Sequence, residues 1–204
     1  MKKALIIFAR NPELGKVKTR LARTMGNEKV LEIYESLLQH TFSISKNTDA
    51  AVFVFVAEEK SKEDTKTDLF QNFTTIHQEG ADLGSRMLHA FTTIFARGYS
   101  DICIIGSDCI TLTEDHLEEA FTKLGAYDIV IGPSEDGGYY LLGMKRLHPT
   151  LFENKTWSTN KVLSETINDI SSLQLSYSFL PVLSDIDTEE DWLHYQNTIQ
   201  QTNP

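Results

Sequence analysis

A cluster of cationic side chains follows the first apolar run of the sequence. The run at residues 4–8 is typical of a buried strand, and Pro12 and Gly15 mark an irregular loop after it. Three of the cations that follow fall within five residues and can together neutralise a diphosphate, since arginine offers a bidentate fork and lysine a point charge. A solvated basic turn is the alternative. The candidate phosphate-binding residues are Arg10, Lys16, Lys18 and Arg20.

This basic loop is not a P-loop. Gly15 and Lys16 match the end of that motif, but Arg10 stands where its first glycine is required and Val17 where a serine or threonine is required. The first 26 residues hold seven lysines and arginines and one acid, Glu13, whereas the whole chain has a net charge of −10. A cationic loop in an acidic chain favours a phosphate site over a general basic surface.

A second candidate is an aspartate that follows a later apolar run. Asp108 comes directly after the strand expected at residues 101–106. Mg²⁺ and Mn²⁺ prefer oxygen ligands and usually take one or two carboxylates, with phosphate oxygens and waters completing the shell. Asp108 is therefore a candidate metal ligand. An aspartate that only shapes a turn is the alternative.

Two acids and two glycines follow the strand expected at residues 127–131. Glu135 and Asp136 can bind hydroxyl groups or act as a general base, which makes them the candidate catalytic residues. Gly137 and Gly138 allow a ligand to approach the backbone, which makes them candidate sugar or acceptor contacts. The same Asp-Gly-Gly sequence is also an ordinary hairpin turn.

Three further residues are weaker candidates. An acidic segment near the C-terminus reads as the start of a helix with Thr188 as its N-cap, and Asp187, just before the cap, is the acid best placed to reach a site. Arg86 can lie near a phosphate or on a helix surface. Trp157 can stack on a sugar ring or cover the core.

Strands that alternate with helical patterns must position these residues. The strands are continuously apolar, which predicts an α/β fold with a mostly parallel central sheet and helices on both faces. We expect one domain, residues 1–204. In such sheets ligands bind beyond the carboxyl ends of the strands, where the basic loop and Asp108 fall. The expected strands are 4–8, 50–56, 74–77, 101–106, 127–131, 139–143 and 174–179, and helices are expected at 17–25, 61–72, 158–170 and 188–199, after Asn27 as N-cap, from Asp82 to Gly98, and after Thr113 as N-cap.

Composition excludes several classes of protein. The net charge of −10 argues against a protein that coats nucleic acid, and no apolar run approaches the roughly 20 residues that a membrane span needs. Cys103 and Cys109 belong to no metal-binding spacing. We expect a cytoplasmic protein whose partners are a nucleotide or nucleotide-sugar and a small-molecule acceptor. The sequence leaves the oligomeric state open.

Five short motifs occur together and in a specific order. The motifs are FARxPxxGKVKTRL at residues 8–21, GADLGSRM at 80–87, GSDC at 106–109, GPSEDGGYYLLG at 132–143 and DIDTEEDW at 185–192. Together they resemble a bacterial family of glycosyltransferase-like proteins with the GT-A fold, often described as arsenosugar-biosynthesis glycosyltransferases. The resemblance implies the nucleotide-diphospho-sugar transferase fold and a transferase that uses a nucleotide-diphosphate-sugar.

More distantly, the chain is similar to nucleotidyltransferases that share this fold. Carried over, the resemblance implies that Lys16, Lys18 and Arg20 bind nucleotide phosphates. It also implies that Asp108 and Asp187 hold Mg²⁺ or Mn²⁺.

The chain departs from both patterns. It has Ala9-Arg10 where those nucleotidyltransferases usually have Gly-Gly, which bears on base recognition. It has a single Asp108 where metal-dependent glycosyltransferases usually have Asp-x-Asp.

Three functions follow as hypotheses. The leading one is a metal-dependent glycosyltransferase in which Asp136 or Glu135 positions or deprotonates the acceptor hydroxyl. The first alternative is a nucleotidyltransferase that joins an NTP to a sugar phosphate or similar acceptor and releases pyrophosphate. The second alternative is a nucleotide-binding protein without turnover.

Overall fold

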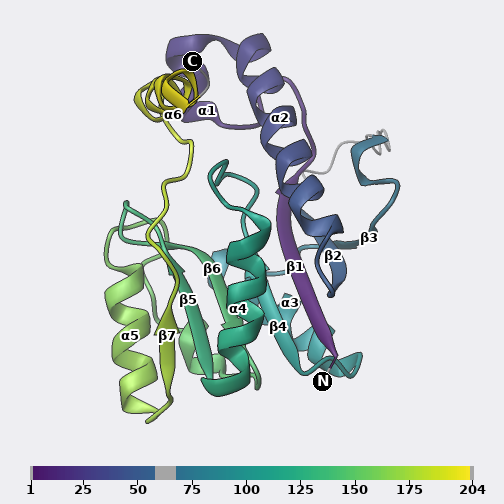
Figure 1. Ribbon diagram of the computed structural model, residues 1–204, viewed down its shortest axis with the longest axis vertical. Coiled ribbons are helices and arrows are strands. Elements are labelled where there is room, and N and C mark those ends of the chain that lie inside the picture. The colour runs from purple at the N-terminus through teal and green to yellow at the C-terminus, as the bar shows by residue number, and fades with distance from the viewer. Residues whose placement is uncertain (1, 58–67, 203–204) are drawn as a thin grey trace.

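The computed structural model describes residues 2–57 and 68–202 (Figure 1). The helix expected at residues 61–72 lies mostly outside this range, and its end forms a short 3₁₀ turn, η1 (Asp68–Phe70). A second such turn is η2 (Pro149–Phe152). The strands are β1 (Lys3–Arg10), β2 (Ala51–Ala57), β3 (Thr74–His77), β4 (Asp101–Ile105), β5 (Ile129–Pro133), β6 (Tyr139–Met144) and β7 (Tyr177–Phe179), and the helices are α1 (Thr19–Met25), α2 (Asn27–Lys46), α3 (Leu83–Ala96), α4 (Glu114–Ala126), α5 (Val162–Ser172) and α6 (Glu189–Thr202).

The strands form one seven-stranded sheet in the order β3-β2-β1-β4-β6-β5-β7. β6 pairs antiparallel with both of its neighbours, and the other described pairs are parallel. The predicted α/β fold with a mostly parallel sheet is therefore confirmed. The chain leaves β1 toward β2 on one side and returns later to β4 on the other side. The crevice between the carboxyl ends of β1 and β4 is consequently the point at which the strand order reverses, where such sheets bind ligands.

Helices bury both faces of the sheet, which explains why the strands show little polar alternation. Along β1, Leu5 and Ile7 belong to one core cluster, and Ala4 and Ile6 belong to another on the opposite face. The first cluster includes side chains of α2 and α4, which lie in front of the sheet in Figure 1. The second includes side chains of α3 and α5.

A third, smaller hydrophobic cluster anchors the C-terminal segment at the carboxyl end of the sheet. Leu21 of α1, Ile33 of α2 and Ile186 pack together, and Trp192 of α6 lies against them. α6 lies beside α1 in Figure 1. The backbone N–H of Ile186 donates to the carbonyl of Asp108 at 3.0 Å. This packing brings residues 185–187 to the loop that follows β4.

Several element boundaries differ by a few residues from the sequence-based predictions, among them the starts of α2, α5 and β7. α2 includes Asn27, and its N-cap is Gly26. α5 begins at Val162 because Ser158 has a φ of 62°, a left-handed conformation that cannot continue a helix. β7 begins only at Tyr177, after Gln174 with a φ of 54°. None of the helices in the described ranges is long and apolar enough to cross a membrane.

Candidate functional site

Lys18 lies at the centre of the polar residues above the β1–β4 crevice. Its Nζ is 2.7 Å from Oδ2 of Asp108 and 2.7 Å from Oδ1 of Asp187. These contacts connect the loop after β1, the loop after β4 and the segment before α6. Only 7% of the Lys18 side chain is exposed, so solvent screens the two ion pairs weakly.

The backbone of Lys18 is strained and its charge is strongly held. Its φ of 44° is in the left-handed region, which costs a residue with a Cβ about 1 kcal/mol. Burial alone would lower its pKa, but Asp108 and Asp187 outweigh this cost and raise the pKa above the ordinary lysine value. The ammonium is therefore charged at every physiological pH.

Asp187 is positioned by the start of α6. Oδ2 of Asp191 accepts hydrogen bonds from the backbone N–H groups of Asp187, at 3.0 Å, and Thr188, at 2.7 Å. Thr188 Oγ1 accepts one from the backbone N–H of Asp191, as its predicted N-cap role requires. Burial would raise the pKa of Asp187, but Lys18 and then Arg20 lower it below the ordinary value. Asp187 is thus an anion held toward Lys18.

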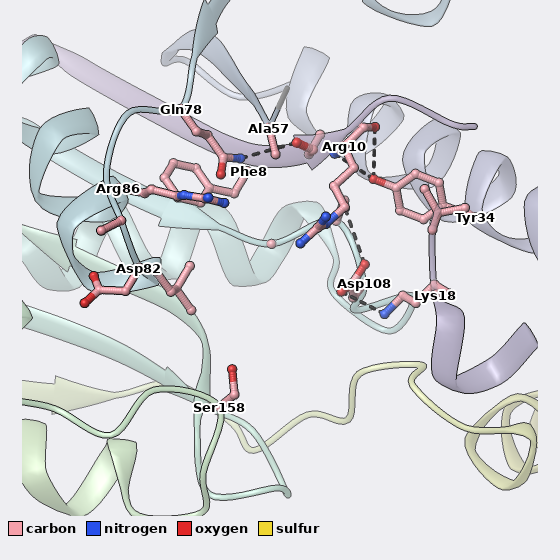
Figure 2. Close-up of a pocket in the computed structure, with 16 residues that line it drawn as sticks. Phe8, Arg10, Lys18, Tyr34, Ala57, Gln78, Asp82, Arg86, Asp108 and Ser158 are labelled. Atoms are coloured by element: carbon pink, nitrogen blue, oxygen red, sulfur yellow. Dashed lines mark hydrogen bonds and ion pairs between the residues drawn. The ribbon is translucent and has the colours of Figure 1, made fainter. Parts of the chain in front are cut away.

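A cavity of about 490 Å³ opens on one side of Lys18 and Asp108 (Figure 2). We call it the Arg86 cavity. Three cations line it, Arg10, Lys18 and Arg86, against two carboxylates, Asp82 and Asp108. In Figure 2, Arg86 extends from α3 along the ring of Phe8. A surplus of cations in a concave site suits a polyanion such as a nucleotide phosphate chain.

Gln78 is a lining residue that the sequence-based predictions missed. Its Nε2 group donates to two backbone carbonyls, those of Phe55 at 2.8 Å and Ala9 at 3.3 Å. Both amide hydrogens are thereby used, so Gln78 offers the cavity only its carbonyl oxygen. Arg86 Nε donates to the carbonyl of Gly80 at 3.1 Å, which leaves its terminal nitrogens available. A hydrogen-bond acceptor and donors therefore face the same cavity.

Tyr34 of α2 holds the loop after β1 and was also not predicted. Its hydroxyl accepts from the backbone N–H of Arg10 at 2.8 Å and donates to the Arg10 carbonyl at 3.1 Å. Burial, assisted by Asp108, raises the pKa of Tyr34, so the hydroxyl stays neutral. The sequence pattern identified Tyr34 only as part of an apolar helix stripe.

A second cavity of about 350 Å³, which we call the Trp157 cavity, lies on the other side of Asp108. Four carboxylates line it, those of Asp108, Asp136, Asp185 and Asp187, against one lining cation, Arg20. The two cavities are contiguous, because five residues line both: Phe8, Leu83, Gly106, Asp108 and Ser158.

Trp157 reaches this cavity because the second residue of α3, Gly84, has no side chain. A Cβ added at Gly84 would lie 2.4 Å from Nε1 of Trp157 and 2.4 Å from the carbonyl oxygen of Phe152. Both distances are shorter than any normal contact. Gly84 therefore allows the indole to pack on the first turn of α3 while it lines the cavity.

Asp185 is the acid of the C-terminal segment that the predictions did not select. Burial, followed by the charge of Asp108, raises the pKa of Asp185 to about 7. No hydrogen-bond donor to its carboxyl group is found in the described ranges. The Asp-x-Asp spacing places Asp185 and Asp187 in the same cavity on either side of the buried Ile186.

Most of the predicted site residues line these two cavities. Arg10, Lys18 and Arg86 line the Arg86 cavity; Arg20, Asp136, Gly138, Trp157 and Asp187 line the Trp157 cavity; and Asp108 lines both. Oδ1 of Asp136 accepts hydrogen bonds from Ser134 Oγ and from the Gly138 N–H, so this carboxylate also closes its own turn.

Three predicted residues lie outside the lining of both cavities. Lys16 Nζ pairs with Oε2 of Glu13 at 2.7 Å within the loop. Glu135 is exposed on the outer side of the turn, where its backbone N–H donates to the Leu183 carbonyl. A Cβ at Gly137 would lie 2.4 Å from the Asn160 carbonyl, so this glycine serves close backbone packing. The structure therefore places these three residues away from the two cavity linings, and their predicted roles stay predictions.

Asp108 and Asp187 fit a hard cation in their donor chemistry. Their carboxylate oxygens converge on one positive group, the Lys18 ammonium. Within residues 2–57 and 68–202, no group of three or more histidines, cysteines, aspartates or glutamates could hold a metal ion. Asp108 and Asp187 are thus a pair of candidate carboxylate ligands among the described residues, and one or two carboxylates are usual where substrate phosphates and water complete the shell of Mg²⁺.

Comparison with known proteins places the chain. The family model described as "Uncharacterized protein conserved in bacteria (DUF2064)" matches residues 40–159. The chain is 28% identical over 187 residues to the 2-phospho-L-lactate guanylyltransferase of Methanocaldococcus vulcanius, which covers 92% of this chain and 81% of the relative. The 2-phospho-L-lactate guanylyltransferase of Methanocaldococcus jannaschii is 26% identical and covers 87% of this chain and 76% of the relative.

Solved structures agree with this placement. A Desulfovibrio desulfuricans G20 protein described as a candidate nucleotide-diphospho-sugar transferase superposes with a TM-score of 0.94 at 30% identity, covering 100% of this chain and 90% of the other. The inositol-1-phosphate CTP transferase of T. maritima has a TM-score of 0.57 at 13% identity, covering 94% of this chain and 91% of the other, and shows the fold alone.

The relatives that match by sequence are named for nucleotide-dependent transfer, which confirms the expected enzyme class at that level. The predicted nucleotide-diphospho-sugar transferase fold is confirmed as well. The chain belongs to the DUF2064 family, within the nucleotide-diphospho-sugar transferase-like superfamily.

Proposed function

We propose that this protein is a nucleotidyltransferase. A phosphate oxygen of a small acceptor attacks the α-phosphorus of a nucleoside triphosphate, a new P–O bond forms, and the bond to the β-phosphate breaks to release pyrophosphate. The observation that carries the proposal is the junction at Asp108 of a cationic cavity and an acidic one. The guanylyltransferase names of the curated relatives favour this reaction over glycosyl transfer.

The Arg86 cavity would receive the nucleotide. Lys18, at its inner end, would face the triphosphate, and Gln78 and Arg86 would contact the base or ribose. Arg10 would face the phosphates from the loop that Tyr34 fixes. This assignment places Lys18 and Arg10 where the negative charge of the triphosphate is greatest.

Lys18 would stabilise the charge that develops during the reaction. Its ammonium is already fixed by two carboxylates and does not need to be ordered when the substrate arrives. A preorganised donor of this kind typically contributes a factor of about 10²–10³ in rate. Arg20, at the mouth of the Trp157 cavity, would face the acceptor phosphate.

Asp108 and Asp187 would hold a Mg²⁺ or Mn²⁺ ion together with the triphosphate. When bound, the ion supplies positive charge that offsets charge on the phosphate oxygens. In the structure the Lys18 ammonium contacts the same two carboxylates. Ion and ammonium would therefore compete for these oxygens, so we expect weak metal binding in the absence of nucleotide.

The proposed reaction changes the role of Asp136. A phosphate monoester has a second pKa of about 6, so its oxygen is already an anion at neutral pH and needs no general base. Glycosyl transfer to a hydroxyl group would need one. We therefore assign Asp136 to acceptor binding and not to proton abstraction.

A product assay distinguishes the three hypotheses. The protein is incubated with each of CTP, GTP, UTP and ATP, with Mg²⁺ or Mn²⁺, and with a mixture of phosphorylated sugars, polyols and amines together with 2-phospho-L-lactate. We expect pyrophosphate release that requires both acceptor and metal and is lost in Lys18→Met. Release of a nucleoside diphosphate from nucleotide-sugars without pyrophosphate from NTPs would support glycosyl transfer, and tight nucleotide binding without any product would support a binding protein.

A further inference from the structure

The acceptor side of the site has an unusual charge for an enzyme that must bind a phosphorylated compound. The four lining carboxylates of the Trp157 cavity stand against Arg20, whose side chain is 72% exposed. Asp108 and Asp187 already face Lys18, so a bound metal or lysine accounts for their charge. Arg20 lies 3.9 Å from Asp187, and no ion pair to Asp136 or Asp185 is found within the part of the chain that the structure describes.

The same cavity has an aromatic and apolar wall. Trp157 packs on Gly84, and Tyr139, Met87 and Val162 complete the wall. Aromatic faces next to carboxylates attract ammonium groups, because the ring quadrupole is negative above its plane. A carboxylate on the acceptor, as in the 2-phospho-L-lactate for which the curated relatives are named, would instead meet like charge.

We propose that the acceptor is a phosphate monoester whose organic part ends in an amine or quaternary ammonium group, with the ammonium seated between Trp157 and the carboxylates of Asp136 and Asp185. The inference rests on the proposed nucleotidyl transfer. One acceptor oxygen forms a bond to the α-phosphorus, pyrophosphate leaves with the electrons of the broken bond, and the ammonium group keeps its charge throughout.

The cavity size is consistent with such an acceptor. About 350 Å³ is enough for a compact phosphorylated amine and sits at the small end of ordinary ligand sites. The phosphate of the acceptor would lie between Arg20 and Asp108, the carboxylate at which the two cavities join. The ammonium would then point away from the triphosphate, and the bound acceptor would add no net positive charge to the cationic cavity.

Acceptor selectivity tests the inference. Pyrophosphate release is measured with phosphorylcholine, phosphorylethanolamine, glucose 1-phosphate and 2-phospho-L-lactate. We expect kcat/KM for the better amine-bearing acceptor to exceed that of the other two by at least 10-fold. Equal or better use of glucose 1-phosphate or 2-phospho-L-lactate overturns the inference while the proposed function stands.

A binding measurement separates failure of the inference from failure of the proposed function. The chain has two tryptophans, so Trp192→Phe leaves Trp157 as the single tryptophan reporter. In the presence of nucleotide, we expect phosphorylcholine to change its fluorescence at concentrations at least 10-fold below those of 2-phospho-L-lactate. If no acceptor yields pyrophosphate, the proposed function fails, and this ratio still decides whether the cavity selects ammonium; a ratio near one overturns that selection.

Two charge-removing variants test the residues. Asp136→Asn and Asp185→Asn should each lower the preference for amine-bearing over neutral acceptors, in turnover or in binding, by at least 10-fold. Asp115→Asn removes an exposed carboxylate on α4 and should keep the preference. Trp157→Phe keeps an aromatic face and should retain most of the selectivity that Trp157→Ala loses. Unchanged selectivity in both Asp136→Asn and Asp185→Asn contradicts the assignment.

Discussion

The two cavities differ in charge although they meet at Asp108 and share five lining residues. Three cations and two carboxylates line the Arg86 cavity, whereas one cation and four carboxylates line the Trp157 cavity. The cationic side comes from the loop after β1 and the start of α3. The acidic side comes from the turn before β6 and the segment before α6.

This difference shows how one fold can separate two anionic substrates that must react. A triphosphate and a phosphorylated acceptor repel each other, and a uniformly basic site would bind two copies of either one. Opposite lining charges assign the polyanion to one side, and Lys18 supplies a positive charge where the two sides join. Electrostatic complementarity of this kind governs which partner binds where.

Removing the ammonium group that Asp108 and Asp187 share should nearly abolish the reaction. Lys18→Met deletes the charge between Asp108 and Asp187 and leaves two carboxylates facing each other. We expect kcat/KM for pyrophosphate release to fall roughly 10³-fold. Lys16→Met is the matched control two residues away, with an expected change below about 3-fold because Lys16 lines neither cavity. Similar losses in both variants would mean that general loop charge matters and not the position of Lys18.

Neutralising the shared carboxylate should weaken metal binding. Asp108→Asn removes one of the two proposed ligands, so we expect Mn²⁺ affinity, measured by calorimetry with nucleotide present, to fall by about 100-fold. Asp115→Asn should bind Mn²⁺ like the wild type. Undiminished Mn²⁺ binding by Asp108→Asn would exclude this carboxylate as a ligand.

Shortening the cation at the far end of the Arg86 cavity should affect nucleotide binding only. Arg86→Ala removes a charged donor at the cavity wall, and we expect nucleotide affinity to fall about 10-fold, which corresponds to about 1.4 kcal/mol. Titration calorimetry measures this effect, with the exposed Arg23→Ala as control. A weaker acceptor affinity with unchanged nucleotide affinity would reverse our assignment of the two cavities.

The carboxyl group of Asp185, which lines the Trp157 cavity, should make the free energy of unfolding depend on pH. The pKa of Asp185 is raised from 3.8 to about 7 in the folded chain, so the folded state binds more protons than the unfolded state between these values. Stability from this group is fully present below about pH 4 and is lost as the pH rises toward 7.

Urea denaturation at pH 5 and pH 8 measures this change in the free energy of unfolding. From pH 5 to pH 8 we expect the free energy of unfolding of the wild type to fall by on the order of 2 kcal/mol more than that of Asp185→Asn, after allowance for partial solvent screening. Asp115→Asn should follow the wild type. Parallel pH profiles for the wild type and Asp185→Asn would show that the Asp185 carboxyl is not perturbed.

Local patterns were sufficient to predict most of the fold. Continuous apolar runs predicted the strands, and Thr113, the predicted N-cap of α4, forms a capping box in the structure. Position after a strand was enough to select Asp108 and the basic loop, because parallel strands bring their carboxyl ends to one edge. Helix and strand starts failed where a left-handed residue intervened, as at Ser158 and Gln174, since side-chain pattern does not report φ.

Local sequence pattern therefore specifies the α/β alternation, the mostly parallel sheet and the edge at which Lys18, Asp108 and Asp187 gather. Which of several similar side chains face a cavity depends on the tertiary structure. Lys16 and Lys18 are two residues apart, yet the left-handed backbone at Lys18 directs one inward while the other pairs with Glu13. The sequence pattern did not predict that Gln78 and Asp185 line the cavities, because these positions depend on contacts with residues distant in the chain.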